Sequence, residues 1–185
     1  MNSIIGIDPG ANGAISTFRG DAYYSDDIDD IISYKCPDSV EGMSDIVGKC
    51  LDGSRGYKND IHAYIEQVHA MPHDGRSSLF KFGTNYGKWL GVLGAYAIDT
   101  TYVSPQKWMK WWEVRMGTKL PKIKKDRKNM LKSWASECTS QKVTLYNADA
   151  ILIAMYGYFN VIENELIELE NKKNKLLAEK EKLGV

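Results

Sequence analysis

The chain has 185 residues, enough for one globular domain with a substantial core and too few for two ordinary domains. Hydrophobic residues make up 43% and aromatic residues 11%, which is typical of a globular protein. The formal net charge of zero would argue against a polyanionic partner if the charges were evenly spread, but they are not.

Positive and negative charges occupy different regions of the chain. From Lys107 to Lys132 there are ten lysines or arginines and two acids, whereas residues 1–66 carry twelve acids and five bases. Such a local excess of positive charge favours an anionic partner, because like charges repel one another without one.

Targeting signals and cysteine pairs are absent from the sequence. No apolar run approaches the roughly 20 residues of a membrane-spanning helix, and the N-terminus lacks the pattern of a secretory signal. We therefore expect a cytoplasmic protein without membrane association. Cys36, Cys50 and Cys138 form no CxxC pair and no even set, which argues against zinc binding and disulfides.

The first predicted element is a core strand over residues 3–7, a β-branched apolar run that Pro9 and Gly10 end. Asp8 lies at the C-terminal tip of this strand. The next residues predict a hairpin over 13–18 and 22–24, followed by a solvated acidic loop or strand edge over 26–30.

The remaining elements follow from apolar spacing and from helix start and stop signals. In chain order they are a helix over 40–51, a strand over 61–68, a helix over 77–93, a strand over 100–103, a helix over 106–112, a loop over 117–122, a helix over 123–137, and a last helix from 148 almost to the end. Glycines recur in the second of these helices at 83, 87, 91 and 94, so we expect one of its faces to approach a neighbouring backbone closely. The order of elements predicts a mixed α/β sheet flanked by helices.

The C-terminal residues show a seven-residue repeat of Ile162, Leu169, Leu176 and Leu183, with Leu166 at a companion position. We expect one domain over residues 1–158 and a helical extension over 159–185. Two interpretations of this extension stay open, namely a coiled coil that dimerises and a solvated helix that frays.

Three acids lie in apolar sequence where a carboxylate does not serve packing: Asp8, Glu66 and Asp149. Burying an unpaired carboxylate costs several kcal/mol, whereas hard cations can compensate a cluster of them. A magnesium or manganese site is the interpretation we favour, if the two strands are adjacent and the last helix crosses them. Each acid alone has a structural alternative, because Asp8 can cap the turn after its strand and Asp149 can cap its helix.

The segments around these acids resemble the three acidic motifs of the RuvC Holliday-junction resolvases, in order and in spacing. The segments are Ile4 to Gly10 with Gly13, Tyr64 to Val68, and Asn147 to Ala154. Further segments, His69 to Pro72, Ser77 to Gly83 and Ser104 to Trp108, resemble the RuvC-like nucleases of phages. The resemblance covers roughly residues 1–158, and the set of three motifs is far more specific than the first motif alone.

The resemblance implies a ribonuclease-H-like fold with a five-stranded sheet, and a homodimer that grips a four-way DNA junction. It also implies paired strand nicking by two-metal hydrolysis, with Asp8, Glu66 and Asp149 as ligands of two Mg²⁺ ions and Mn²⁺ as a plausible substitute. One position departs from the family pattern. Where a fourth ligand usually lies, three residues before the last acid, the chain has Tyr146, and Asn147 is the nearest oxygen ligand.

The basic segment and the loop after Glu66 supply the predicted DNA contacts. By resemblance these are His69, Ser77, Lys81, Lys107, Lys124, Lys125, Arg127 and Lys128. For His69, as for His73, an ordinary loop histidine stays open as the alternative. For Trp108, Trp111 and Trp112, which are interleaved with the basic residues, we favour positions in the core. Forks and flaps are expected substrates beside four-way junctions.

Two other functions compete with a nuclease. A dimeric junction-binding protein with a decayed site is suggested by Tyr146. An actin-like ATPase fragment is less favoured, because no P-loop and no second phosphate-binding glycine hairpin are apparent, so we expect no use of ATP.

Overall fold

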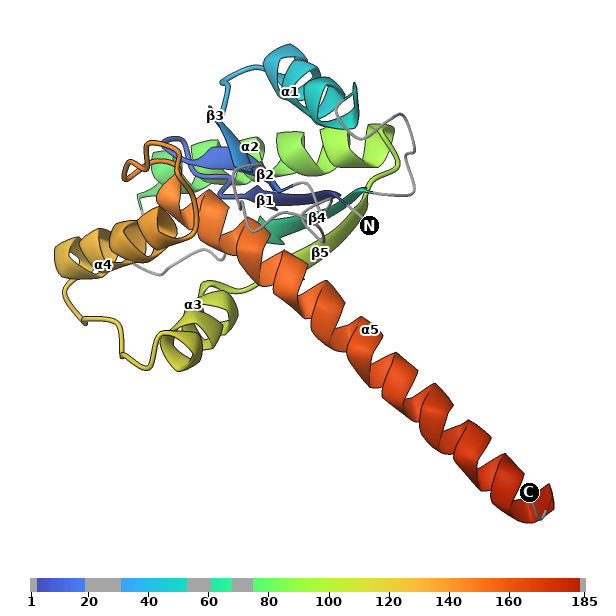
Figure 1. Cartoon of the computed structure of the whole chain (residues 1–185). Helices are drawn as coiled ribbons and strands as arrows, with labels where there is room; N and C mark the ends of the chain where they lie inside the picture. Colours follow the sequence, from blue (N-terminus) through green and yellow to red (C-terminus); the bar gives the residue numbers. More distant parts are fainter. Residues whose placement is uncertain (1–2, 19–30, 53–60, 68–74, 184–185) are drawn as a thin grey trace.

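The fold is built around one mixed five-stranded sheet (Figure 1). The computed structural model describes residues 3–18, 31–52, 61–67 and 75–183, with the side chains of all of these except residues 52 and 177–183. The strands are β1 (Ser3–Ile7), β2 (Ala14–Phe18), β3 (Ile31–Lys35), β4 (Ile61–Glu66) and β5 (Asp99–Val103), in the spatial order β3-β2-β1-β4-β5. The pairs β1–β2 and β2–β3 are antiparallel, and β1–β4 and β4–β5 are parallel. The predicted mixed α/β architecture is confirmed.

Helices cover both faces of the sheet. They are α1 (Val40–Asp52), α2 (Arg76–Ala95), α3 (Pro105–Arg115), α4 (Lys124–Glu137) and α5 (Ala148–Leu183). One core joins the sheet to α1 and α2, and the other joins it to α3, α4 and the first turns of α5. Because each face has its own apolar core, the central strands are buried on both sides.

The alternation of side chains along β1 and β4 determines which residues of these strands face α5. Successive side chains of a strand point to opposite faces. Ile5 and Ile7 belong to the core on the α1 and α2 side, and Ile4 belongs to the core on the α5 side. The next even-numbered positions, Gly6 and Asp8, therefore lie toward α5. The same argument applies to β4, where Tyr64 and then Glu66 follow on the α5 side.

Glycine at position 6 lets α5 lie directly on β1. A Cβ atom there would overlap backbone atoms of Ala150 and Ala154. A Cβ atom at Gly157 would likewise overlap the ring of Tyr64. These two contacts press the beginning of α5 against β1 and β4, which brings Asp149 to the C-terminal ends of those strands.

Beyond this contact α5 continues as a straight projection away from the sheet (Figure 1). The whole helix has 36 residues, and every side chain from Glu163 to Leu176 is exposed. Leu166, Leu169 and Leu176 of the predicted heptad are 59–62% exposed. The predicted helical extension is thus present, and no described part of the chain covers its apolar stripe.

Two expectations from the sequence require correction. The strand that pairs with β2 is β3 at Ile31–Lys35, a segment for which no strand was predicted; the predicted partner over residues 22–24 lies outside the described part. The glycines of α2 approach no neighbouring backbone, because a Cβ atom at Gly83, Gly87, Gly91 or Gly94 would meet nothing within 4 Å. The close neighbour expected for that face is therefore not another part of this chain among the described residues.

A membrane span was not expected. Among the described residues, no helix combines the length and the apolar character needed to cross a bilayer.

Candidate active site at the ends of β1 and β4

Asp8 follows β1 directly and is held in the tight turn that leads to β2. Its backbone N–H donates to the carbonyl of Ala14 over 3.0 Å, and its Oδ1 accepts from the backbone N–H of Gly10 over 2.9 Å. The turn-capping alternative considered for Asp8 is therefore present. It uses one carboxylate oxygen, so it is compatible with a second role for the other oxygen.

Glu66 is the last residue of β4, which runs parallel to β1 with Ile65 opposite Ile7. The pairing therefore brings Glu66 to the same edge of the sheet as Asp8. Oε1 of Glu66 accepts a hydrogen bond from the indole Nε1 of Trp108 over 3.0 Å. The two strands are therefore adjacent, which is the condition that the metal-site interpretation required of them.

Asp149 lies in the first turn of α5. Its side chain is only 16% exposed, although a charged residue near a helix start is usually solvated. The residue before the helix is Asn147, whose backbone oxygen accepts from the N–H of Ile151. Asn147 therefore occupies the capping position that was considered for Asp149, and the Asp149 carboxylate is left for another role.

The three carboxylates influence one another electrostatically. Burial raises the pKa of Asp8 above its ordinary value. Burial, followed by repulsion from Asp8, raises the pKa of Glu66 to about 7 and that of Asp149 to about 6. Asp149 also raises the pKa of Glu66. Two strands and one helix thus place three mutually repelling acids in a poorly solvated site, an arrangement that favours either protonation or a cation.

Basic residues of α4 lie beside the acids. The Lys128 ammonium is 3.9 Å from Oδ2 of Asp149, and its charge lowers the pKa values of all three carboxylates. Arg127 also lowers the pKa of Asp149. Because neither cation outweighs burial, the site retains a demand for further positive charge.

The donor set fits a hard divalent cation. Carboxylate oxygens are the ligands that Mg²⁺ and Mn²⁺ prefer, and three carboxylates lie near one another here in a poorly solvated site. As the side chains stand in the described part of the chain, no three His, Cys, Asp or Glu residues are close enough to share one ion. Asp8, Glu66 and Asp149 are therefore neighbours that interact through their charges, and holding a common cation requires them to move closer.

The position of the fourth family ligand supplies no such oxygen. Tyr146 is 37% exposed. Asn147 is buried, and its Oδ1 accepts from both the backbone N–H and the hydroxyl of Thr144, over 2.7 and 3.0 Å. Its amide nitrogen donates to the carbonyl of Lys142. The Asn147 side chain is committed to the turn before α5, so its oxygen is not available as a substitute ligand.

The fold resembles two solved structures. T. thermophilus RuvC in complex with Holliday junction substrate matches with a TM-score of 0.56 and 16% identity, over 89% of this chain and 97% of that chain. Thermus thermophilus RuvC matches with a TM-score of 0.54 and 17% identity, over 88% of this chain and 96% of that chain. This chain has the RuvC fold. The sequence matches no protein-family model and no curated protein.

The RuvC fold confirms the ribonuclease-H-like architecture that the resemblance of the three motifs implied. Within it the predicted DNA-contacting residues lie on three helices. Ser77 and Lys81 are exposed on α2, Lys107 is exposed on α3, and Lys124 and Lys125 are exposed on α4. His69 lies outside the described residues.

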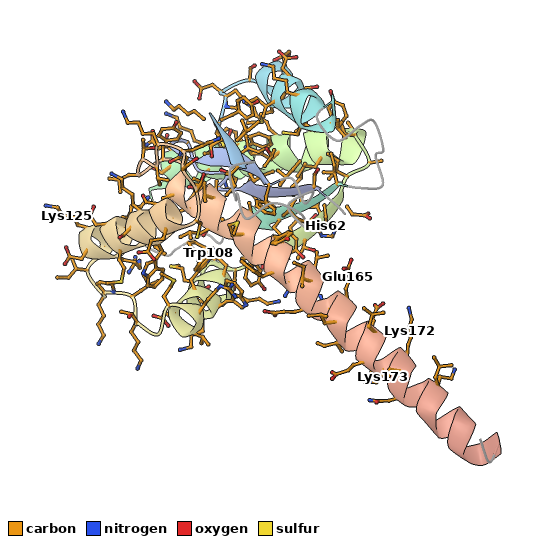
Figure 2. The ribbon with its side chains drawn as sticks, in the orientation of Figure 1. His62, Trp108, Lys125, Glu165, Lys172 and Lys173 are labelled. Atoms are coloured by element: carbon orange, nitrogen blue, oxygen red, sulfur yellow. The ribbon has the colours of Figure 1, made fainter. Side chains whose placement is uncertain are left out.

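The basic residues of α4 differ in their distance from the acids. Lys128 contacts Asp149, and Arg127 acts on it through charge. Lys125 instead extends from the outer end of α4 (Figure 2). Within the predicted DNA-contacting residues of α4, Arg127 and Lys128 therefore lie beside the acids, and Lys125 lies away from them.

Sequence reasoning missed the role of Trp108. We expected the tryptophans in the core, and Trp108 is indeed 1% exposed, but its indole N–H also contacts the Glu66 carboxylate of the site. The available signal was that Trp108 follows shortly after the strand predicted over residues 100–103. That strand pairs with the strand that carries Glu66. The pattern of apolar spacing gives no information on where an indole N–H points.

Proposed function

We propose that the chain is a metal-dependent, structure-selective endodeoxyribonuclease that resolves Holliday junctions and other branched DNA by paired strand nicking. The observation that carries the proposal is that Asp8, Glu66 and Asp149 lie near one another at one edge of a RuvC-like sheet, where burial raises all three pKa values and the charge of Asp8 raises those of the other two. A purely structural role accounts poorly for this arrangement, because burial still outweighs the partners of each carboxylate and holds all three pKa values above their ordinary range.

In this proposal Asp8, Glu66 and Asp149 hold two Mg²⁺ ions, which Mn²⁺ can replace. Such a pair of ions supplies an activated water and stabilises the leaving 3′ oxygen. The protein fixes the carboxylates directly after β1, at the end of β4 and in the first turn of α5, and the sheet and α5 exclude water from one side of them. Lys128 brings a positive charge beside Asp149, where it can hold a phosphate of the DNA against the acids.

The proposed DNA path follows the exposed basic residues of α2, α3 and α4. Lys81, Lys107, Lys124 and Lys125 would neutralise phosphates, and each contact releases roughly one counterion. We expect four-way junctions, forks and flaps as substrates, in the cytoplasm of a host cell if the protein belongs to the phage RuvC-like branch. Paired nicking of two strands requires two sites, so the active form in this proposal is a homodimer.

One observation favours a second candidate, a junction-binding protein with weak or no cleavage. Tyr146 replaces the fourth acidic ligand, and the Asn147 amide is used within its own turn. A site with three carboxylates has one negative charge fewer to hold two cations. Weak metal binding, rather than loss of the fold, is what distinguishes this candidate from the first.

A cleavage assay on matched substrates separates the two. The purified full-length chain is incubated with a labelled four-way junction or a linear duplex of the same arm sequence, in Mg²⁺, in Mn²⁺ or in chelator. The nuclease proposal predicts nicks in the junction, few in the duplex and none in chelator. Tight junction binding without nicks in either metal would favour the binding protein, and equal nicking of the duplex would contradict structure selectivity.

A further inference from the structure

Trp108 contacts Glu66 through a hydrogen bond whose direction is fixed by chemistry. An indole Nε1–H only donates, so the Glu66 oxygen that it contacts must accept. The two atoms are 3.0 Å apart, and the indole is 1% exposed. A hydrogen bond to a carboxylate in such a site is stronger than one between neutral groups, and no water competes for the donor.

The fold holds the indole in place independently of Glu66. Strand β5 pairs with β4, and the backbone N–H of Gln67 donates to the carbonyl of Val103 over 2.7 Å. Ser104 follows at once as the N-cap of α3, where its hydroxyl accepts from the backbone N–H of Lys107. Since one residue joins β5 to α3, Trp108 comes to lie within the first turns of a helix that is anchored beside the end of β4.

The two oxygens of Glu66 are thereby made unequal. Oε1 is engaged by Trp108, whereas Oε2 has no hydrogen-bond partner among the described residues. A carboxylate that binds an ion through both oxygens suits Ca²⁺, which accepts bidentate ligands and irregular shells. Mg²⁺ is smaller and demands a regular octahedron, which a single carboxylate oxygen fits better.

We propose that Trp108 is a positioning residue that restricts Glu66 to one ligating oxygen and so favours Mg²⁺ over Ca²⁺ in this site. The inference rests on the proposed function, because it assumes that Glu66 is a metal ligand. Hydrogen-bonding partners of metal ligands typically change metal affinity by about 10- to 100-fold when they are removed.

Trp112 offers a matched control one turn further along α3. It is also 1% exposed, and its Nε1 donates to the backbone carbonyl of Leu152 over 3.0 Å. Trp112→Phe therefore removes the same N–H from the same helix and the same core. It differs from Trp108→Phe in that no acid of the site loses a partner.

The test measures Mg²⁺ and Ca²⁺ binding to the full-length protein by titration calorimetry without DNA. We expect Trp108→Phe to lower the ratio of Mg²⁺ to Ca²⁺ affinity about tenfold relative to the unsubstituted chain. Trp112→Phe should leave this ratio unchanged while lowering the melting temperature. An unchanged ratio in Trp108→Phe, or an equal change in both variants, would overturn the inference.

A second measurement covers the case in which Trp108→Phe does not fold. In the unsubstituted chain labelled with ¹⁵N-tryptophan, Mg²⁺ should shift the indole resonance of Trp108 and leave that of Trp112 in place. If calorimetry detects Mg²⁺ binding and the Trp108 resonance does not move, the inference alone is wrong. If the unsubstituted chain binds neither ion, the metal site of the proposed function is wrong, and the inference is overturned with it.

Discussion

From Ala148 to Gly157 helix α5 packs against the sheet, and every side chain except that of Asp149 is buried, whereas from Glu163 to Leu176 every side chain is exposed. The backbone conformation is the same in both halves, so the difference lies in the sequence. Alanine, isoleucine and leucine surround Asp149 in the first half, and glutamate and lysine surround isolated leucines in the second.

The comparison distinguishes acids that only keep the helix solvated from an acid whose surroundings indicate a function. Acids of the second half, such as Glu168 and Glu170, are solvated and require no explanation beyond helix solubility. Asp149 lies in the half that the sheet holds rigid, and its pKa is raised to about 6 by burial and by Asp8. The site thus depends on the packed half of α5, and we expect substitutions in the exposed half to leave the site intact.

The largest contrast between the halves is expected from removing one acid in each. Asp149→Asn keeps the shape of the side chain but removes a proposed ligand, so junction cleavage should fall by roughly a thousandfold. Glu168→Gln, the matched change in the exposed half, should leave cleavage unaltered. Nicking rates on a labelled junction measure both, with gel-shift binding as the control for folding. Unchanged nicking by Asp149→Asn would remove this residue from the site.

A smaller but clear contrast concerns stability. Gly6→Ala places a methyl group against the backbone of Ala150 and Ala154, so the free energy of unfolding should fall by about 3 kcal/mol. Leu169→Ala in the exposed half should change it by less than about 0.5 kcal/mol. Urea denaturation measures both variants. Equal losses would mean that the exposed half is packed in solution.

The pH dependence of stability without metal probes the acids of the packed half. The folded-state pKa of Glu66 is about 7 and its ordinary value is 4.5, so between these values the folded state binds a proton that the unfolded state does not. Its contribution to stability is present below pH 4.5 and is lost as the pH rises through about 7. Glu66→Gln removes this loss.

In chelator, Glu66→Gln should therefore gain roughly 1–3 kcal/mol of stability relative to the unsubstituted chain between pH 5 and pH 8. Glu168→Gln is the control, for which no such gain is expected. Urea midpoints at the two pH values give the comparison, and adding Mg²⁺ at pH 8 should stabilise the unsubstituted chain more than Glu66→Gln. A variant that follows the unsubstituted chain at both pH values would contradict a charged, buried Glu66.

The smallest effect on the site is expected from removing residues 159–185, which include the exposed half together with Phe159 and Val161 at the edge of the core. A chain that ends after Tyr158 should retain the fold and junction cleavage, because the acids and their contacts lie before that residue. Sedimentation of the two chains tests whether residues 159–185 contribute to dimerisation. Loss of folding on truncation would show that the predicted boundary at 158 lies too early in α5.

Much of the fold was predictable because long apolar patterns dominated it. Periodicity predicted β1, β4, β5 and all five helices, and resemblance of the motifs predicted the sheet around the acids. The segment Ile31–Lys35 was missed because the acidic residues before it indicated a loop, while its short apolar run pairs at a sheet edge. Propensity arguments are weakest for such edge strands, since neighbouring strands decide their pairing.

The acids of the site were predictable in kind, and their partners were not. Asp8 follows one apolar strand and Glu66 ends another, so alternation and parallel pairing place them together. The hydrogen bonds of Trp108 and Asn147 depend on side-chain orientation, which one sequence does not encode locally. The open glycine face of α2 shows the same limit, because spacing predicted a close neighbour and no described part of the chain supplies one.

Mapping the cut ends on a four-way junction tests the central claim most directly. Both strands of one opposed pair are end-labelled, and the unsubstituted full-length chain is added with Mg²⁺. The account predicts two nicks at symmetric positions, which a ligase can seal, and none when Asp8 is replaced by Asn. Absence of nicks in both Mg²⁺ and Mn²⁺, or nicks that persist without Asp8, would contradict it.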